Sequence, residues 1–432
     1  MAIRRLKVSN FRSFNELDVE LGDFNVLIGA NASGKSNFVE IFRFLRDIRK
    51  EGLRDAVALQ RGSRYVQNLR IGATEPLTLD ITDEQDVAYE VMSTHEEEAR
   101  HFVRVNEMNY GFSLDFPAND RGPHADNWNI QRDSIVREFS VYPSRARDDN
   151  RENPGKLIGT LEFSAWREKN ILKREYRGDP FLIELLGQKE DVGHFDSGLF
   201  PMDSLLLESR LFTYLLTGKL APPFSTIRDP GIFRTDARAS QRTQTMRASA
   251  ALTESASNLA PILDRILSNK NSRKTLLSLV KYLLPFINDI GVQNQTDESS
   301  SLYVKEAFTD ETRLYADMIS EGTIAAIALV VALYFEENPL LIFEDPDRGM
   351  HPKLMSRMVE MMKEVSKDKQ IIVTTHHPEM VRYAGVENLL LVSRDEDGFS
   401  QISRPADKTM VKRFLENDIG IDELYVDDLL EV

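Results

Sequence analysis

The pattern of apolar and polar positions predicts a β-rich first part of the chain. Apolar residues alternate with polar ones at residues 3–8 and 17–21, which is the period of a half-buried strand. Residues 24–28 are mainly apolar and are typical of a buried strand, and the apolar residues after Lys35 recur at the spacing of one helix face. Further strands are predicted at residues 77–81, 87–92, 102–105, 112–116 and 157–163, and the polar segment 117–154 is predicted as long loops.

From residue 181 onward the apolar spacing changes to that of helices. Leucines between residues 205 and 216 suit a packed helix, and apolar stripes between residues 262 and 287 predict a helical pair. No heptad pattern runs far enough to predict a long coiled-coil arm. We therefore expect a short insertion that begins with strands and continues with helices.

Helix and strand patterns alternate from residue 319 to residue 392. An apolar helix is predicted to run to about Phe335, another helix starts at Pro352, and strands are predicted at residues 340–344, 371–375 and 389–392. Such alternation is what a parallel sheet covered by helices requires, so the predicted fold class is α/β. The second helix carries an apolar stripe that we interpret as a core face: Leu354, Met358, Met361, Met362 and Val365.

Composition and charge narrow the class of protein. The 432 residues are 41% hydrophobic and contain no Cys, which excludes a disulfide scaffold, a Cys-type zinc site and a thiol nucleophile. The N-terminus lacks the apolar stretch of an export signal, and the longest apolar run is too short to span a bilayer, so we expect a cytoplasmic protein without a membrane partner. The net charge of −15 argues against a surface that coats nucleic acid everywhere but leaves a local basic groove open.

A complete phosphate-loop motif, Gly-Ala-Asn-Ala-Ser-Gly-Lys-Ser, occupies residues 29–36 between a predicted strand and a predicted helix. Such a turn aims backbone N–H groups and the helix dipole at one point, where Lys35 adds a mobile positive charge. The Ser36 hydroxyl is placed to reach Mg²⁺. A nucleoside triphosphate is therefore the expected ligand.

Three motifs near the other end of the chain suit the same ligand. Glu344 and Asp345 end an apolar strand, which is how a second strand delivers a metal-bridging and a water-orienting carboxylate. Ser320 and Gly322 open an apolar helix, whose orphan N–H groups form a small-residue anion site. His376 ends another strand, where a histidine can contact the terminal phosphate. Each motif is weak by itself, but their order and spacing together are specific.

The order of these motifs resembles the ABC-type ATPase heads of the RecF, SMC and OLD group. The resemblance rests on Asn-Phe-Arg-Ser at residues 10–13, the phosphate loop, Ser-Glu-Gly-Thr at 320–323, Phe-Glu-Asp-Pro-Asp-Arg-Gly-Met-His-Pro at 343–352 and Thr-Thr-His at 374–376. It covers roughly residues 1–80 and 255–405, and looks closest to stand-alone ATPases of prokaryotic DNA repair or antiphage defence loci. It implies a two-lobed P-loop ATPase head with a mixed β lobe and a helical insertion.

The resemblance also implies roles for single residues. Glu344 takes the Walker B position beside Mg²⁺, Asp345 the position of the catalytic base, and His376 that of the switch histidine. Ser320, Glu321 and Gly322 form the signature that covers the ATP of a second copy, so a nucleotide-sandwich dimer is implied, and residues 347–351 form the D-loop. The expected nucleotide-binding residues are Gly29, Asn31, Ser33, Gly34, Lys35, Ser36 and Asn37, with Ser36 and Glu344 on the metal.

Two departures from the family pattern limit these expectations. The usual order is Asp then Glu or Glu then Glu, whereas here Glu344 precedes Asp345, so a base shorter by one methylene predicts slow hydrolysis or a bind-and-hold cycle. The glutamine that normally links nucleotide to the helical lobe is ambiguous, because Gln60 and Gln67 are both available.

Two segments outside the ATPase motifs are candidates for partner contacts. The arginines between residues 228 and 247, of which we single out Arg234, Arg238 and Arg242, could contact nucleic acid, an acidic partner or the nucleotide across a dimer, or belong to a solvated linker. The acidic tail after Asn417 interleaves apolar residues and is interpreted as a docking segment. The predicted segments are an N-terminal ATPase lobe (1–100), the insertion (101–312), a C-terminal ATPase lobe (313–405) and the tail (406–432).

These features leave three functions open. The first is a dimeric or higher-order ATPase that controls a separate effector, most readily a nuclease or another toxin, since no nuclease centre is visible in the chain itself. The second is a RecF-like structural ATPase that binds DNA. The third is an ATP-gated scaffold that sequesters a partner with little turnover. An ABC transporter ATPase is disfavoured by the long insertion before the signature.

Overall fold

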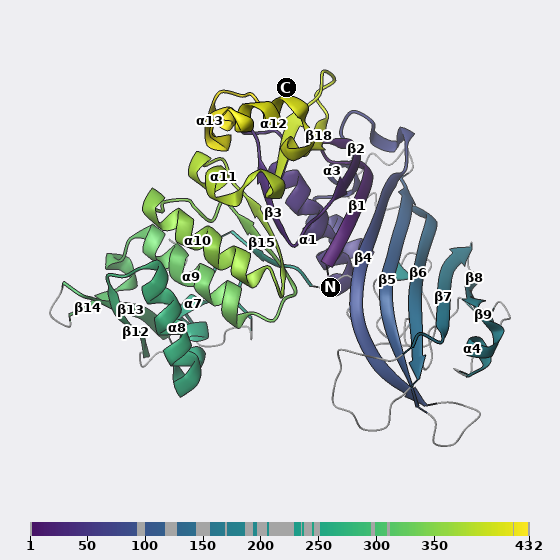
Figure 1. Cartoon of the computed structure of the whole chain (residues 1–432), viewed down its shortest axis with the longest axis horizontal. Helices are drawn as coiled ribbons and strands as arrows, with labels where there is room; N and C mark the ends of the chain where they lie inside the picture. The colour runs from purple at the N-terminus through teal and green to yellow at the C-terminus, as the bar shows by residue number, and fades with distance from the viewer. Residues whose placement is uncertain are drawn as a thin grey trace. The chain divides into compact units, whose positions relative to one another are not determined.

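The structure is a computed structural model, which describes residues 2–92, 100–116, 128–143, 156–168, 171–185, 193–196, 205–206, 229–234, 236, 244–245, 251–294, 299–308, 312–417 and 419–430 (Figure 1). The chain divides into two compact units. Unit 1 consists of residues 1–21, 40–228 and 394–401, and unit 2 of residues 22–39, 229–393 and 402–432. The predicted arginine cluster lies outside the described residues except for Arg234, and so does most of the predicted helix at 205–216.

Unit 1 is built on an eight-stranded antiparallel sheet with the order β2-β1-β4-β5-β6-β7-β8-β9. Its strands are β1 (Ala2–Phe11), β2 (Phe14–Glu20), β4 (Leu77–Met92), β5 (Arg100–Asp115), β6 (Asn129–Pro143), β7 (Gly159–Glu168), β8 (Ile171–Gly178) and β9 (Gly193–Asp196). The described helical turns of this unit are α2 (Leu53–Leu59), α3 (Ser63–Val66), η1 (Gly72–Thr74) and α4 (Pro180–Leu185).

The prediction of long loops at 117–154 is wrong where β6 runs through the middle of the sheet. The buried face of β6 contains Asp133 and Arg137 among its apolar residues, and these charges conceal the alternation of a strand. The sheet accommodates Asp133 because it accepts hydrogen bonds from the Tyr110 hydroxyl at 3.2 Å and from the Leu206 N–H at 2.7 Å. Charged residues also conceal β8, which the sequence did not predict.

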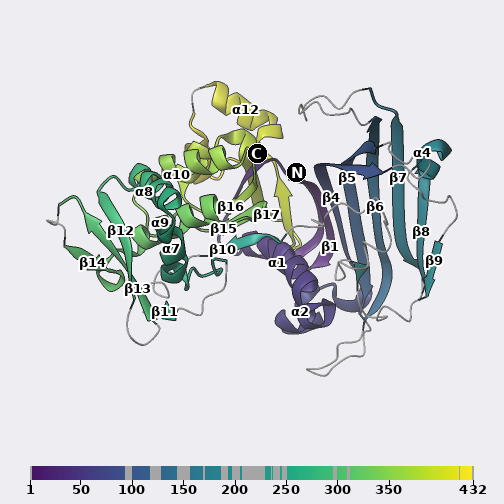
Figure 2. The ribbon, with the colours of Figure 1, turned by 90° about the horizontal axis from the view of Figure 1, so that it is seen from below.

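Unit 2 contains a six-stranded sheet with the order β10-β15-β16-β3-β17-β18 (Figure 2). Strands β10 to β17 of this order run parallel, which places their carboxyl ends at one edge. The strands are β3 (Phe24–Ile28), β10 (Gly231–Phe233), β15 (Leu340–Glu344), β16 (Gln370–Thr374), β17 (Leu389–Arg394) and β18 (Ser400–Ser403). The sequence predicted β3, β15, β16 and β17 as strands, and all four are confirmed.

Helices cover the parallel sheet of unit 2. Helix α9 (Glu321–Phe335) is apolar around its whole circumference and almost completely buried, which explains why it shows no amphipathic stripe. Helix α10 (Pro352–Val365) packs beside α9 with the methionine stripe inward, which confirms the core-face interpretation. Four short helices also belong to this part of unit 2: α11 (Pro378–Ala384), η5 (Ala316–Met318), η6 (Val386–Asn388) and η7 (Pro405–Asp407).

A small antiparallel sheet and a helical pair complete unit 2. Helices α7 (Leu259–Ser268) and α8 (Lys270–Leu283) confirm the predicted pair. Ile287, which was assigned to that pair, instead starts strand β12, so the second helix ends earlier than expected. This sheet contains β11 (Gln244–Thr245), β12 (Ile287–Asn294), β13 (Ser299–Glu306) and β14 (Arg313–Tyr315).

Helix α1 and the C-terminal tail both contact or adjoin the phosphate loop. Helix α1 (Lys35–Glu51) begins directly after the phosphate loop, and its later apolar residues join the core of unit 1, where Phe44 packs on Phe11 at 6.0 Å between ring centroids. The tail forms α12 (Thr409–Glu416) and α13 (Ile421–Val426), and α13 packs against α11 within unit 2. Among the described helices, none is both long enough and apolar enough to cross a membrane.

Candidate functional site

Polar residues from three neighbouring strands gather at the carboxyl edge of the parallel sheet. The phosphate loop follows β3, Glu344 ends β15, and Thr375 and His376 follow β16, which lies between the other two strands. In the register of the sheet, Glu344 pairs with Thr374, and Thr374 pairs with Leu27, just before the phosphate loop. Ligands of open parallel sheets bind at this edge, so the topology brings the predicted motifs to the expected place.

The phosphate loop has the backbone conformation that its glycines permit. Gly29 and Gly34 have φ angles of 145° and 127°, which disfavour any residue with a side chain. A Cβ atom on Gly29 would also lie 2.2 Å from the carbonyl oxygen of Val392, so the loop approaches β17 too closely for another residue. The first turn of α1 contains no acidic residue, which leaves the helix N-terminus free of competing negative charge.

Lys35 is folded onto its own loop. Its Nζ donates to the carbonyl oxygens of Gly29 at 2.6 Å and Ala30 at 3.0 Å, and only 7% of the residue is exposed. Burial lowers the pKa of the Lys35 ammonium, and the nearby charge of Asp345 opposes this effect. Lys35 is therefore a largely desolvated cation beside an exposed helix N-terminus, a combination that attracts phosphate.

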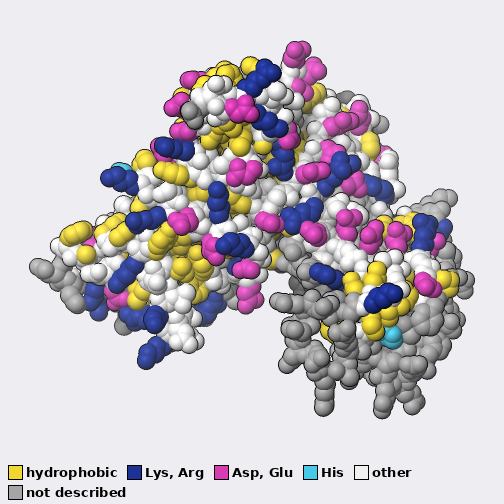
Figure 3. All heavy atoms as spheres, viewed as in Figure 1, with side chains coloured by type: hydrophobic (Ala, Val, Ile, Leu, Met, Phe, Trp, Pro, Cys, Tyr) yellow, Lys and Arg dark blue, Asp and Glu magenta, His cyan; other side chains and the backbone are white. Residues whose placement is uncertain are grey.

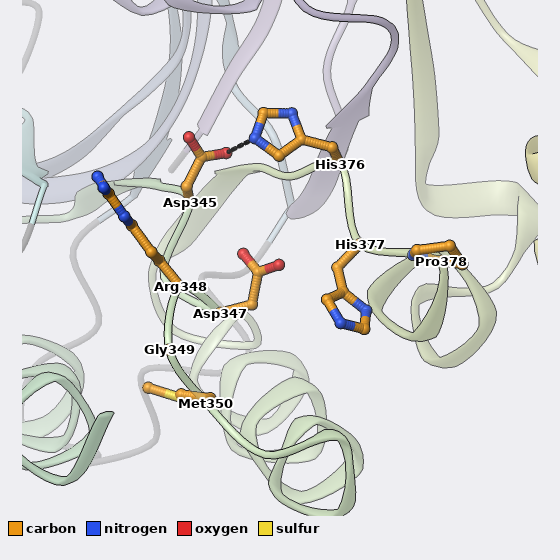
Figure 4. A pocket seen from close by; sticks show the side chains of 8 residues that line it. All are labelled: Asp345, Asp347, Arg348, Gly349, Met350, His376, His377 and Pro378. Carbon is orange, nitrogen blue, oxygen red and sulfur yellow. Dashed lines mark ion pairs between the residues drawn. The ribbon is translucent and has the colours of Figure 1, made fainter. Parts of the chain in front are cut away.

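Asp345 and His376 form an ion-pair contact at the open side of the site (Figure 4). The distance from His376 Nε2 to Asp345 Oδ1 is 3.3 Å, and both side chains are partly exposed, at 49% and 36%. The Asp345 N–H donates to the Thr374 carbonyl oxygen at 3.0 Å, which fixes the backbone where β15 ends. The preceding Glu344 is buried. Asp345 and His376, two of the side chains predicted to act in catalysis, are thus in contact.

Asp347 and Thr375 form a second polar contact, which the sequence did not predict. The Thr375 hydroxyl donates to Asp347 Oδ2 at 2.9 Å and accepts from the His377 N–H at 3.0 Å. Burial raises the pKa of the Asp347 carboxyl, although the Thr375 hydrogen bond acts in the opposite direction. The sequence placed Asp347 in the predicted D-loop and Thr375 at the end of a predicted strand, but it did not predict that the two side chains meet. Asp347 lines a pocket of about 430 Å³ together with Asp345, Arg348, Gly349, Met350, His376, His377 and Pro378.

The signature residues begin α9 and pack on the loop after Glu344. The Ser320 side chain caps α9 by accepting the Thr323 N–H at 3.1 Å, while Ser320 and Glu321 remain exposed. A Cβ atom on Gly322 would lie 2.3 Å from the Gly349 carbonyl oxygen. Only glycine therefore permits the start of α9 to touch this loop, which links the signature to the loop that carries Asp347.

The residues present fit a triphosphate with a magnesium ion. The exposed Ser36 hydroxyl starts α1, and the buried Glu344 carboxylate ends β15. Within the described part of the chain no group of three or more His, Cys, Asp or Glu side chains could hold a metal alone. One carboxylate and one hydroxyl are what Mg²⁺ uses when phosphate oxygens and water complete its shell, so Ser36 and Glu344 would hold it together with the nucleotide.

Both candidate glutamines lie in unit 1 and are engaged there. The Gln60 side chain accepts from the Arg12 guanidinium, and the Gln67 side chain donates to the Gly72 carbonyl oxygen at 3.1 Å. The assignment of the glutamine loop therefore stays open between these two residues. Arg234, the described member of the predicted arginine cluster, follows β10, is exposed and donates its backbone N–H to the Glu254 carbonyl oxygen at 2.8 Å.

Comparison with known families decides the class of protein. A family described as "AAA domain, putative AbiEii toxin, Type IV TA system" matches residues 24–190 and 207–382, which is well over half of the chain. The chain belongs to this AAA-domain family. The matched residues include the phosphate loop, the signature, Glu344, Asp345 and His376, so the AAA-domain assignment covers the whole candidate site. The family confirms the prediction of an ABC/AAA-like ATPase, and the mixed sheets and helices confirm the predicted α/β fold class.

Relatives of this AAA-domain chain come from the predicted group. It is 28% identical over 102 residues to the Septu protein PtuA of Bacillus thuringiensis, a match that covers 21% of this chain and 26% of the relative. It is 32% identical over 89 residues to the DNA replication and repair protein RecF of Streptococcus suis, covering 19% of this chain and 24% of RecF. The matches thus span about a quarter of each relative. The prediction of an ATPase related to RecF is confirmed.

Solved SMC heads are similar over nearly the whole chain. The Smc head with an extended coiled coil bound to a ScpA domain, from Pyrococcus furiosus, has a TM-score of 0.44 at 13% identity and covers 96% of this chain and 99% of its own. The SMC head domain of Thermotoga maritima has a TM-score of 0.40 at 11% identity and covers 94% and 99%.

Proposed function

We propose that this protein binds and hydrolyses ATP, that ATP joins two copies, and that the paired state controls a separate effector. The observation that carries the proposal is the meeting of Lys35, Glu344 and Asp345 at one edge of a parallel sheet in a member of an ATPase family. Lys35 and Asp345 are close enough to interact electrostatically, as a phosphate cation and a water-orienting carboxylate must be.

In the proposed reaction each side chain has one task. Lys35 would leave the carbonyl oxygens of its own loop to bind phosphate, and Ser36 and Glu344 would hold Mg²⁺, which would neutralise phosphate charge. Asp345 orients the attacking water and accepts its proton, while His376 donates a hydrogen bond from Nε2 toward the terminal phosphate. The short Asp345 side chain reaches less far than Glu, so we expect slow turnover.

The second copy would supply the signature. Ser320 and Glu321 are exposed at the start of α9, and the positive end of this helix would favour the phosphate of another copy. The tight contact of Gly322 with Gly349 supports coupling between this signature and the loop that follows Glu344. An effector encoded separately, such as a nuclease or another toxin, is supported by the likeness to the Septu protein PtuA.

The decisive experiment measures phosphate release and self-association of the purified protein. We expect wild type to hydrolyse ATP slowly, Lys35→Ala to bind nucleotide much more weakly, and Asp345→Asn to bind ATP, accumulate as a dimer and release little phosphate. Lys367→Ala and Asp368→Asn change the same residue types at exposed positions after α10 and should behave like wild type. Phosphate release that survives both Lys35→Ala and Asp345→Asn would exclude the proposed site. Nucleotide-dependent pairing without any turnover would instead favour the scaffold function.

A RecF-like nucleic-acid function is the second candidate, and one surface of unit 1 favours it. Arg61, Arg64 and Arg70 are exposed beside the exposed Tyr65, and none forms an ion pair with a carboxylate of the described residues. The chain around these arginines is hydrogen-bonded to Asn10, whose side chain accepts from the Asn68 N–H and donates to the carbonyl oxygens of Gly72 and Glu75. Elsewhere basic and acidic side chains are interspersed on the face shown in Figure 3. Arginines without a carboxylate partner beside an aromatic ring suit phosphate contact and base stacking.

The test of this second function replaces Arg61, Arg64 and Arg70 by Ala together. If the chain binds DNA through this surface, affinity for a single-stranded oligonucleotide falls about 10-fold or more and its salt dependence becomes less steep. The matched control replaces Arg132, Arg177 and Arg273, which are paired with acidic side chains, and should leave affinity unchanged. Salt-independent binding, or an equal loss in the control, would reject this surface. The parallel prediction for Arg234, Arg238 and Arg242 is tested in the same assay.

A further inference from the structure

The C-terminal tail reaches the phosphate loop through one tyrosine. Ile421, Leu424 and Leu430 are buried in the core of unit 2, which anchors α13 beside α11. Tyr425, on the same helix, is half-buried, and its hydroxyl lies 3.5 Å from the carbonyl oxygen of Gly29. That distance is longer than an ordinary O–H···O hydrogen bond, so the contact is weak as it stands.

The Gly29 carbonyl oxygen already has a strong donor. Lys35 Nζ lies 2.6 Å from it, which is short even for a charge-assisted hydrogen bond. Gly29 is buried, and its backbone is held by its φ of 145° and its close approach to Val392. A buried carbonyl group that cannot turn toward water needs a donor, and losing the donor is unfavourable.

When Lys35 moves to the phosphates of a nucleotide, it takes this donor away. We propose that Tyr425 is a positioning residue whose hydroxyl takes over the Gly29 carbonyl oxygen as Lys35 turns to the nucleotide. The inference rests on the proposed function, because it assumes that Lys35 binds phosphate. Tyr425 is the side chain placed for this exchange, since its hydroxyl contacts the same oxygen atom as the Lys35 ammonium.

Asp347 is a second charged neighbour of Tyr425. Its carboxylate is close enough to act electrostatically on Tyr425, and its Oδ1 atom is buried without a hydrogen-bond partner in the described part of the chain. The tyrosine is thus near both the phosphate loop and the loop that follows Glu344. A tail held in this position favours the nucleotide-bound arrangement of Lys35. Displacement of α13 by a partner would therefore weaken nucleotide binding.

The first test is a double-mutant cycle on nucleotide affinity. Tyr425→Phe keeps the ring and its packing but removes the hydroxyl, so we expect about 3- to 10-fold weaker binding of ATP and of ADP. In a Lys35→Met background the Gly29 carbonyl oxygen depends on Tyr425 with or without nucleotide, so the same change should leave affinity unaltered. An equal loss in both backgrounds, or no loss in either, would overturn the proposal.

The second test needs no nucleotide and therefore separates this inference from the proposed function. Without ligand, Tyr425→Phe should leave the melting temperature nearly unchanged in wild type, where Lys35 holds the carbonyl group. In the Lys35→Met background it should lower the melting temperature by about 1 to 2 °C, since a buried acceptor loses its remaining donor. The matched control is Tyr383→Phe in α11, because the Tyr383 hydroxyl makes no hydrogen bond within the described residues. This substitution should leave the melting temperature unchanged in both backgrounds. Equal shifts in both backgrounds would refute the exchange even if ATP binding is confirmed.

Discussion

Asp345 stands in the left-handed region of backbone conformation, with a φ of 44°. Residues with side chains avoid this region, and Asp and Asn occupy it more readily than others because their short polar side chains hydrogen-bond locally. A glutamate lacks this advantage. The unusual order of Glu344 followed by Asp345 therefore has a conformational reason: the turn after β15 favours the shorter acid at the position of the base.

The positive φ of Asp345 predicts that glycine stabilises the folded chain more than alanine at this position, which is the reverse of their usual order. Asp345→Gly should be more stable to unfolding than Asp345→Ala by about 1 kcal/mol, because glycine adopts the left-handed conformation without a steric penalty. Urea unfolding of the two variants measures the difference. At Asp368, which does not have a positive φ, the same pair of substitutions should not favour glycine. A more stable alanine variant at residue 345 would show that the turn relaxes.

Asp347 predicts a dependence of stability on pH. Burial raises its pKa above the ordinary value of 3.8, so the folded chain keeps this proton to higher pH than the unfolded chain does. Its contribution to stability is therefore fully present below 3.8 and is lost as pH rises through the raised pKa. Asp347→Asn should unfold at a higher temperature than wild type near neutral pH and lose this advantage in acid. Thermal unfolding across pH checks this, and a constant difference at every pH would contradict it.

At the scale of elements, the start of α9 and the loop at Gly349 form one packed joint. Gly322→Ala would place a methyl group 2.3 Å from the Gly349 carbonyl oxygen, so we expect it to destabilise the protein. Glycine to alanine inside a helix otherwise stabilises by about 1 kcal/mol, whereas overpacking costs about 1 to 3 kcal/mol. Chemical denaturation measures whether Gly322→Ala raises or lowers the free energy of unfolding. Glu321→Ala, one residue earlier and exposed, should change stability little. If Gly322→Ala stabilises the protein, the start of α9 and the loop at Gly349 can move apart to make room for the methyl group.

The elements that the sequence predicted are those whose pattern is local. The phosphate loop with β3 and α1, and the apolar strands β15 and β16, each carry their signal within a few consecutive residues. Strand β6 was not predicted because its buried face includes Asp133 and Arg137, whose environment comes from distant residues such as Tyr110. The Asp347–Thr375 contact was not predicted for the same reason. It joins two turns whose proximity depends on how the strands pair, and the sequence contains no rule for that.

At the scale of the whole molecule, net charge separates the two candidate functions. Each copy carries a net charge of −15, so pairing of two copies is opposed by repulsion that salt screens. Between about 50 and 300 mM salt we expect the ATP-dependent dimer of Asp345→Asn to become tighter, whereas any binding to nucleic acid becomes weaker. Sedimentation measures the first and oligonucleotide titration the second. A dimer that dissociates as salt rises would indicate that local ion pairs dominate the interface.

Each unit consists of three separate stretches of the chain, so no single cut divides the protein into its two units. The chain passes between the units at residues 21–22, 39–40, 228–229, 393–394 and 401–402, and α1 starts in unit 2 with Lys35 and ends in unit 1. The predicted segment boundaries at residues 100, 312 and 405 remain a prediction about the linear chain. In space, neither unit is a continuous stretch that can be cloned by itself. A shortened chain without unit 1 loses most of helix α1, whose first turn follows the phosphate loop. The two units therefore have to be expressed and engineered together.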